Sequence, residues 1–205
     1  MSDQKRIFVA IDISDEARSQ IADYSEGLRK RFPAARCSWV RPENLHITLR
    51  FIGNVDDEGL AAWSQKVAAA AASIAPFSLV IEGTGKFSQR RQRTDVLWIG
   101  SRAETADRLT QIARDLNDGK AIKPHVTIGR FKDSPDASQL AAEHCAASFV
   151  PLAFDVTELV VYESRLTPNG SIYTQIFRAP LSAITSSTPA DRPAATGGRP
   201  SRPSR

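Results

Sequence analysis

Apolar residues recur along the chain with two spacings, which alternate as far as about residue 180. Apolar residues at every second position, or in short unbroken runs, predict strands at 6–12, 37–40, 45–53, 77–83, 96–100 and 124–131, and longer ones near 152–163 and 171–179. Apolar residues three or four positions apart predict helices after Ser14 and at 56–73, 104–116 and 137–145. The pattern predicts a mixed chain of strands and helices.

The order of these elements is similar in the two parts of the chain. It reads β-α-β-β-α-β and then β-α-β-α-β-β, which is typical of an α+β fold with largely antiparallel sheets. We therefore expect two pseudo-symmetric lobes, with two mainly antiparallel sheets around a central cleft and helices outside.

Composition changes abruptly near residue 183. Residues 183–205 are rich in Pro, Gly, Ser, Thr and Ala and contain four Arg and one Asp, so they supply +3 of the net charge of +4. Such a segment buries too little apolar surface to fold. We expect one bilobal domain over 1–182 and a disordered tail over 183–205, so the high isoelectric point says little about the folded part.

Other bulk features set the class of protein. No apolar run approaches the roughly 20 residues that span a bilayer. The N-terminus lacks the apolar core of a signal peptide, and two cysteines form neither a disulfide framework nor a zinc pattern. These features favour a cytoplasmic protein without a membrane partner, and we expect a monomer.

Two of the three histidines occupy matching segments. The sequence ENLHITLRF contains His46 and Thr48, and KPHVTIGRF contains His125 and Thr127. Residues i and i+2 of a strand share a face, so each His lies beside its Thr. If the lobes are related by a pseudo-two-fold axis, the two His-Thr faces line one cleft from opposite sides.

Such a cleft suits in-line displacement at phosphorus. Imidazole titrates near neutral pH, so one His can act as general base on water while the other protonates the leaving oxygen. The hydroxyls of Thr48 and Thr127 can donate to phosphate oxygens. The repeated context favours a functional site over ordinary packing of the histidines.

Neighbouring residues are less clearly assigned by spacing. Strict alternation turns Arg130 and Phe51 away from the histidine face, unless Gly129 permits a bulge or the strands bend. No third ligand stands at a metal-binding spacing, so we expect no metal and no cofactor. His144 lacks the shared context and is expected on the surface or at a helix cap.

Charged and aromatic residues outside the paired motifs add little. Residues 86–95 carry four basic side chains before Asp95 on an expected hairpin loop, which could steer a polyanion or be merely solvated. Trp39, Trp63 and Trp98 are expected in the core.

The paired motifs HITL and HVTI resemble those of the 2H phosphoesterases. With RIFVAID, RPENLHITLRFIG, LWIG and ELVVYESRLTPNGSIYTQI, the chain is similar over residues 5 to about 180 to the RNA 2′,3′-cyclic phosphodiesterases, also called 2′-5′ RNA ligases. The resemblance implies hydrolysis of a terminal 2′,3′-cyclic phosphate to a 2′-phosphate without a cofactor. The partners would be RNA ends, tRNA halves among them, with reversible 2′-5′ joining as a side activity.

The resemblance also implies a role for each site residue. His46 would be the general acid and His125 the general base. Thr48, Thr127 and Arg130 would bind the phosphate, and Phe51 would stack on the terminal base. The symmetry of the motifs does not itself distinguish acid from base.

Two other functions remain open at the level of sequence. One is a non-catalytic module that binds RNA or nucleotides, which would not need both complete His-Thr pairs. The other is a phosphodiesterase that acts on small cyclic phosphates.

Overall fold

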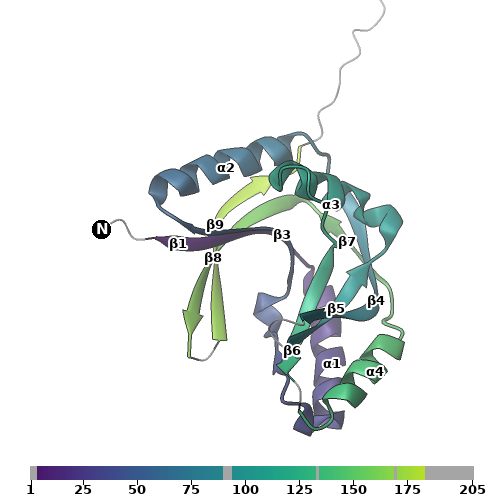
Figure 1. Ribbon diagram of the computed structural model, residues 1–205. Coiled ribbons are helices and arrows are strands. Elements are labelled where there is room, and N and C mark those ends of the chain that lie inside the picture. The colour runs from purple at the N-terminus through teal and green to yellow at the C-terminus, as the bar shows by residue number, and fades with distance from the viewer. Residues whose placement is uncertain (1–3, 90–93, 133, 169, 183–205) are drawn as a thin grey trace, which may run out of the picture.

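The computed structural model describes residues 4–89, 94–132, 134–168 and 170–182 (Figure 1). The described strands form one nine-stranded sheet in the order β7-β4-β5-β6-β3-β1-β8-β9, with β2 paired to β6. All recorded strand pairs are antiparallel. The sheet curls into two lobes, and the predicted α+β class with antiparallel sheets and a central cleft is confirmed.

The paired His segments form the two strands at the centre of the sheet. They are β3 (His46–Val55) and β6 (His125–Lys132). The two strands share one recorded register pair, Ile47 opposite Val126. This short junction joins the two sheets predicted from the sequence into a single sheet.

Each lobe contains one central strand and its neighbours. Beside β3 lie β1 (Lys5–Asp12), β8 (Glu158–Thr167) and β9 (Gly170–Pro180). The strands on the side of β6 are β2 (Ser38–Trp39), β4 (Phe77–Gln89), β5 (Thr94–Ser101) and β7 (Leu152–Val156). The lobes therefore exchange strands, since β4 joins the second lobe and the last two strands return to the first.

The strand predicted near 152–163 is wrong in one respect, because it is two strands. It breaks at Thr157, after which β7 pairs with β4 while β8 pairs with β1 on the other lobe. Apolar residues continue on both sides of Thr157, and no Gly or Pro marks the break. The hydrophobic pattern alone therefore does not reveal the break at Thr157.

The helices lie outside the sheet (Figure 1). They are α1 (Asp15–Arg31), α2 (Asp57–Ala72), α3 (Ala103–Leu116) and α4 (Ala137–Ala146), with 3-10 turns η1 (Pro33–Ala35) and η2 (Pro42–Asn44). Helices α2 and α3 pack on each other; α2 also packs on β8 and β9, and α4 on β4. The predicted helices are confirmed to within a few residues.

Local sequence signals account for the helix ends. Ser14 Oγ caps α1 by accepting a hydrogen bond from the Ala17 amide. Asp56 Oδ1 caps α2 by accepting one from the Gly59 amide. Gly119 follows α3 with φ of 85°, and its amide donates to the Arg114 carbonyl at 2.8 Å. Leu109, Ile112 and Leu116, which lie three or four positions apart along α3, are fully buried.

Some sequence predictions fall outside the described residues. These are the tail over 183–205 and most of the basic loop, including Arg90, Arg91 and Arg93. The loop does connect two paired strands, and at its base Lys86 forms an ion pair with Asp95 at 2.9 Å. In the described part of the chain, no helix is both long and apolar enough to cross a membrane.

Candidate active site

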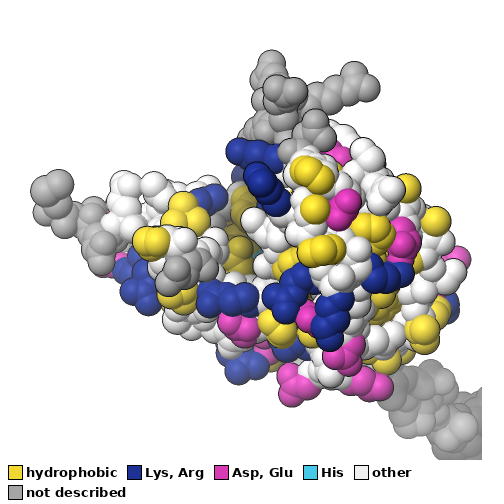
Figure 2. Space-filling view, turned by 90° about the horizontal axis from the view of Figure 1, so that it is seen from below, with side chains coloured by type: hydrophobic (Ala, Val, Ile, Leu, Met, Phe, Trp, Pro, Cys, Tyr) yellow, Lys and Arg dark blue, Asp and Glu magenta, His cyan; other side chains and the backbone are white. Residues whose placement is uncertain are grey.

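A cleft of about 540 Å³ lies between the two lobes. It is lined by residues of β1, β3, β6, β8 and β9, together with parts of β4 and β5. Seen from below, the molecule is hollowed between its lobes, and Lys and Arg side chains lie on several sides of the hollow (Figure 2). The residues singled out from the sequence all line this cleft: His46, Thr48, Phe51, His125, Thr127 and Arg130.

His46 is held in one tautomer at the start of β3. Its Nδ1–H donates to the Asn44 carbonyl at 2.7 Å, because a carbonyl can only accept. In the neutral ring, Nε2 then accepts a hydrogen bond from Thr48 Oγ1 at 2.9 Å. Ile47 and Leu49 point the other way and are buried, which anchors the strand.

His125 repeats this arrangement in the other lobe. Its Nδ1–H donates to the Lys123 carbonyl at 2.7 Å, again two residues earlier in the chain. Val126 and Ile128 are fully buried behind it. Both imidazoles therefore present Nε2 as the ring nitrogen available for proton transfer.

Burial lowers the pKa of both histidines. The pKa of His46 falls to about 4, and the Asn44 carbonyl and the nearby Asp12 carboxylate offset the burial only in part. The pKa of His125 is also lowered, first by burial and then by the positive charges of Arg130 and Lys123. Both rings are thus neutral at pH 7.

A bulge in β6 turns Arg130 into the cleft. Trp98 lies opposite Thr127 and Val96 lies opposite Arg130, so one extra residue is inserted in β6 between these pairs. Trp98 and Val96 are two positions apart and share a face, so their partners share a face as well. Of the two routes that the sequence left open for Arg130, the structure has the bulge, which lies between Thr127 and Gly129, and Arg130 joins Thr127 in the cleft.

A bulge in β3 likewise turns Phe51 into the cleft. Ala10 lies opposite Thr48 and Phe8 lies opposite Phe51, which leaves one extra residue in β3 between them. The Phe51 side chain is 66% exposed, and its ring centroid lies 5.9 Å from that of Phe8. The strand therefore bends as the sequence required.

Aromatic rings enclose the two imidazoles. The Phe8 and Tyr173 ring centroids lie 4.9 and 5.4 Å from that of His46. On the other side, Phe87 lies 4.9 Å from His125 and the buried Trp98 ring lies 6.4 Å from it. These rings supply the burial that lowers both pKa values.

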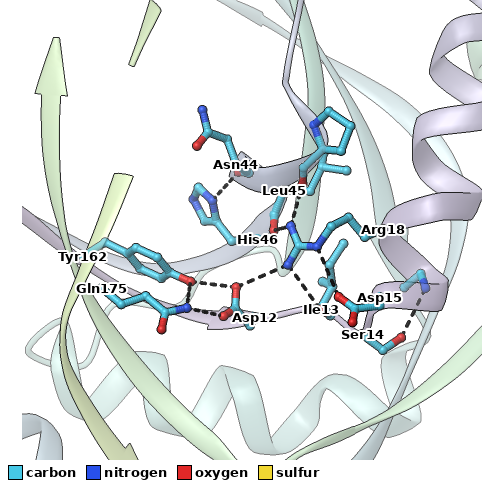
Figure 3. Close-up of polar contacts among 12 residues, drawn as sticks. Asp12, Ile13, Ser14, Asp15, Arg18, Asn44, Leu45, His46, Tyr162 and Gln175 are labelled. Carbon is cyan, nitrogen blue, oxygen red and sulfur yellow. Dashed lines mark hydrogen bonds and ion pairs between the residues drawn. The ribbon is translucent and has the colours of Figure 1, made fainter. Parts of the chain in front are cut away.

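A polar network that the sequence analysis missed lies behind His46 (Figure 3). The Asp12 carboxylate accepts hydrogen bonds from Tyr162 Oη at 2.6 Å and Gln175 Nε2 at 2.7 Å. Arg18 lies 3.6 Å from the same carboxylate and donates to the carbonyls of Pro42 and Leu45.

This network fixes the turn η2 that carries the Asn44 carbonyl. Asn44 Nδ2 in turn donates to the Ser171 carbonyl at 2.9 Å, so the turn is held from α1 and from β9. Strand alternation could have placed Asp12 on the same face as Phe8 and Ala10. Nothing in the sequence indicated that Tyr162 and Gln175, 150 and 163 residues away, would be its partners.

His144 is not at the surface, which corrects the sequence-based expectation. It is fully buried, and its Nε2–H faces the carbonyls of Gly85 and Trp98, each at 3.1 Å. Its Nδ1 accepts from Tyr24 Oη at 2.9 Å. Because α4 packs on β4, this side chain ties the helix to the sheet and lies outside the cleft.

Among the described residues, there is no group of three or more His, Cys, Asp or Glu side chains that could hold a metal ion. Cys37 and Cys145 are both free.

Comparisons with known proteins agree with the geometry. The family model described as LigT like Phosphoesterase matches residues 11–98 and, separately, residues 99–173. The two matches meet within β5, between the paired His segments, as expected for two related halves.

Similar proteins cover most of the chain. An RNA 2′,3′-cyclic phosphodiesterase of Thermotoga maritima is 32% identical over 181 residues, covering 84% of this chain and 93% of the relative. One from Escherichia coli K12 is 30% identical, covering 87% and 97%.

Solved structures extend the likeness to three dimensions. The crystal structure of TT0787 of Thermus thermophilus superposes with a TM-score of 0.67 and 26% identity, covering 86% of this chain and 97% of that one. Escherichia coli LigT complexed with 3′-AMP gives a TM-score of 0.66 and 26% identity, covering 88% and 99%.

Proposed function

Since the chain belongs to the LigT-like phosphoesterase family, we propose that it hydrolyses the 2′,3′-cyclic phosphate at the 3′ end of RNA and leaves a 2′-phosphate. The observation that carries this proposal is the pair of His-Thr faces, His46 with Thr48 and His125 with Thr127, lining one cleft. The curated relatives named RNA 2′,3′-cyclic phosphodiesterase support the substrate class.

The proposed reaction is one displacement at phosphorus. His125 Nε2 takes a proton from water as the water oxygen bonds to phosphorus, and the bond from phosphorus to O3′ breaks. His46 gives a proton to the departing O3′. Thr48, Thr127 and Arg130 donate hydrogen bonds to the non-bridging oxygens, where negative charge resides.

The acid role of His46 requires a protonated ring. Its pKa of about 4 leaves the ring neutral at pH 7. A bound phosphodiester carries a negative charge beside Nε2, and an opposite charge within a few ångströms raises the pKa of an imidazole. The direction of proton transfer rests on the family resemblance, while the low pKa of His46 alone favours the reverse assignment.

The terminal base would stack on Phe51, whose exposed ring lies at the mouth of the cleft. Single-stranded RNA ends are commonly held through such stacking. We include tRNA halves among the candidate RNAs, and reversible 2′-5′ joining as the same displacement with an RNA hydroxyl in place of water. The enzyme is proposed to act as a monomer in the cytoplasm.

The test is turnover of an RNA oligonucleotide ending in a 2′,3′-cyclic phosphate by wild type, His46→Ala and His125→Ala. Each substitution should lower turnover at least ~10²-fold with an unchanged circular dichroism spectrum, because it removes one proton-transfer group. Binding without turnover by wild type would favour the non-catalytic RNA module. Wild-type rates in a folded variant would contradict the two-histidine mechanism.

A further inference from the structure

Two large apolar side chains on one wall of the cleft are exposed to solvent. Phe51 and Leu166 line the cleft and are 66% and 70% exposed. A single exposed apolar residue is ordinary, but two that line one cavity indicate a surface that a ligand covers. Phe51 is assigned to the terminal base, whereas Leu166 has no role in the proposed reaction.

Strand register places Leu166 beyond the reacting centre. Tyr162, Ser164 and Leu166 alternate along β8 and share a face, and Tyr162 packs beside Phe8 near His46. Leu166 lies four positions after Tyr162 along the strand, which corresponds to about 13 Å. The β8–β9 hairpin extends past β1 in Figure 1, and Leu166 lies near the end of β8 in this hairpin.

An exposed cation lies on the same wall. Arg6 lines the cleft two positions before Phe8 on β1, and in the described ranges it has no ion-pair or hydrogen-bond partner. Ile7 lies opposite Glu163, so the next rung of the ladder brings Arg6 beside Ser164. A guanidinium next to a hydroxyl is a combination that binds phosphate oxygens.

We propose that Arg6, Ser164 and Leu166 form a subsite for the nucleotide that precedes the terminal one in the RNA. Arg6 and Ser164 bind the phosphate linking these two nucleotides, and Leu166 packs against the base of the preceding one. The subsite rests on the proposed function and deepens it. It makes a single-stranded RNA end, rather than a mononucleotide, the preferred substrate.

The positive charge of the subsite and its continuity with the cleft favour a nucleotide of the same RNA as its occupant. The subsite joins the cleft that contains the histidines, and it combines an apolar surface with a positive charge that has no partner among the described residues. Nucleic acid offers a phosphate and a flat base at each nucleotide, and unpaired bases are held by stacking on aromatic side chains or by burial against apolar ones. A small cyclic phosphate would leave Arg6 and Leu166 unused.

The test compares kcat/KM on a mononucleoside 2′,3′-cyclic phosphate and on a trinucleotide with the same terminal group. Wild type should prefer the trinucleotide, and Arg6→Ala or Leu166→Ala should lower that preference roughly tenfold, as expected for losing a charge-assisted hydrogen bond or the burial of a leucine side chain against a base. Trinucleotide affinity, measured by fluorescence anisotropy, should fall in parallel.

Two substitutions serve as matched controls. Arg165→Ala removes an exposed arginine from the opposite face of β8, and Val150→Ala shortens an exposed apolar side chain outside the cleft. Both should retain the wild-type preference.

Equal kcat/KM on both substrates in wild type, or an unchanged preference in Arg6→Ala and Leu166→Ala, would overturn the subsite while leaving the proposed hydrolysis intact. Failure to turn over either substrate would count against the hydrolysis, and the anisotropy measurement would still test the subsite.

Discussion

His46 and His125 are held by the same backbone device. Each donates its Nδ1–H to the carbonyl two residues earlier, at 2.7 Å in both cases. A fixed tautomer leaves Nε2 available to move a proton, and which nitrogen carries the hydrogen is set by the bond that the other makes. The two residues differ in their surroundings, since Asp12 and its network lie only behind His46.

A sulfur substitution distinguishes the two roles. A cyclic phosphate with sulfur at the bridging 3′ position has a leaving group that needs no protonation, so it bypasses the general acid. We expect His46→Ala to recover at least ~10-fold on this substrate relative to the oxygen substrate, while His125→Ala does not. Recovery in His125→Ala instead would reverse the assignment.

At this scale the sequence was most informative where a motif repeats. His46, Thr48, His125 and Thr127 were predicted from repetition and strand alternation, and all four line the cleft. The network around Asp12 was not predicted, because its hydrogen bonds join residues that only the tertiary fold brings together. His144 was misjudged for the same reason, since its carbonyl partners lie on distant strands.

Bulges in the two central strands decide which side chains reach the cleft. Without them, alternation would turn Arg130 and Phe51 toward the packing face. In β6 the adjacent Gly129 is tightly packed, since a Cβ there would lie 2.6 Å from Cys37 Sγ and 3.2 Å from Trp39 Cε3.

Gly129→Ala should therefore be costly for both stability and activity. Overpacking should lower the free energy of unfolding by about 1–3 kcal/mol, and a shift of β6 should displace Arg130 and lower kcat/KM. Urea denaturation and turnover measure the two effects. The control is Gly27→Ala in α1, where the added Cβ would meet nothing within 4 Å beyond its chain neighbours and the backbone of the helix, and a gain of roughly 0.5–1 kcal/mol is expected. A Gly129→Ala protein as stable and active as wild type would contradict this role of the bulge.

Hydrophobic spacing and helix caps predict most of the helices and strands, but they do not predict which strands pair with each other. The sequence predicts a strand near 152–163 but gives no sign that its halves pair with β4 and β1 in different lobes. The need for a bulge could be read from Gly129 and Arg130, but whether it forms depends on packing against Cys37 and Trp39.

The whole molecule combines two similar halves that exchange strands across one sheet. The family model matches each half separately, and β3 and β6 meet at the centre. This symmetry puts two imidazoles in one cleft, with burial lowering the pKa of each. His144 is likewise buried, and its pKa is also lowered.

Burial of these histidines makes stability depend on pH. In the unfolded chain they titrate near pH 6.5, so below that pH the unfolded state binds more protons than the folded state. The free energy of unfolding should therefore fall as the pH is lowered from about 7 toward about 4, the pKa of His46. Urea denaturation across this range measures the effect, and His46→Ala should show a shallower dependence. A stability that stays constant or rises on acidification would refute this view of the buried rings.

The most direct test of the account is the product formed from an RNA oligonucleotide ending in a 2′,3′-cyclic phosphate, with excess EDTA present. Proton transfer by His46 and His125, with phosphate binding by side chains of the cleft, predicts undiminished turnover to a 2′-phosphate. A 3′-phosphate product would contradict the proposed leaving group. Turnover abolished by EDTA and restored by a divalent metal would contradict catalysis by the two histidines alone.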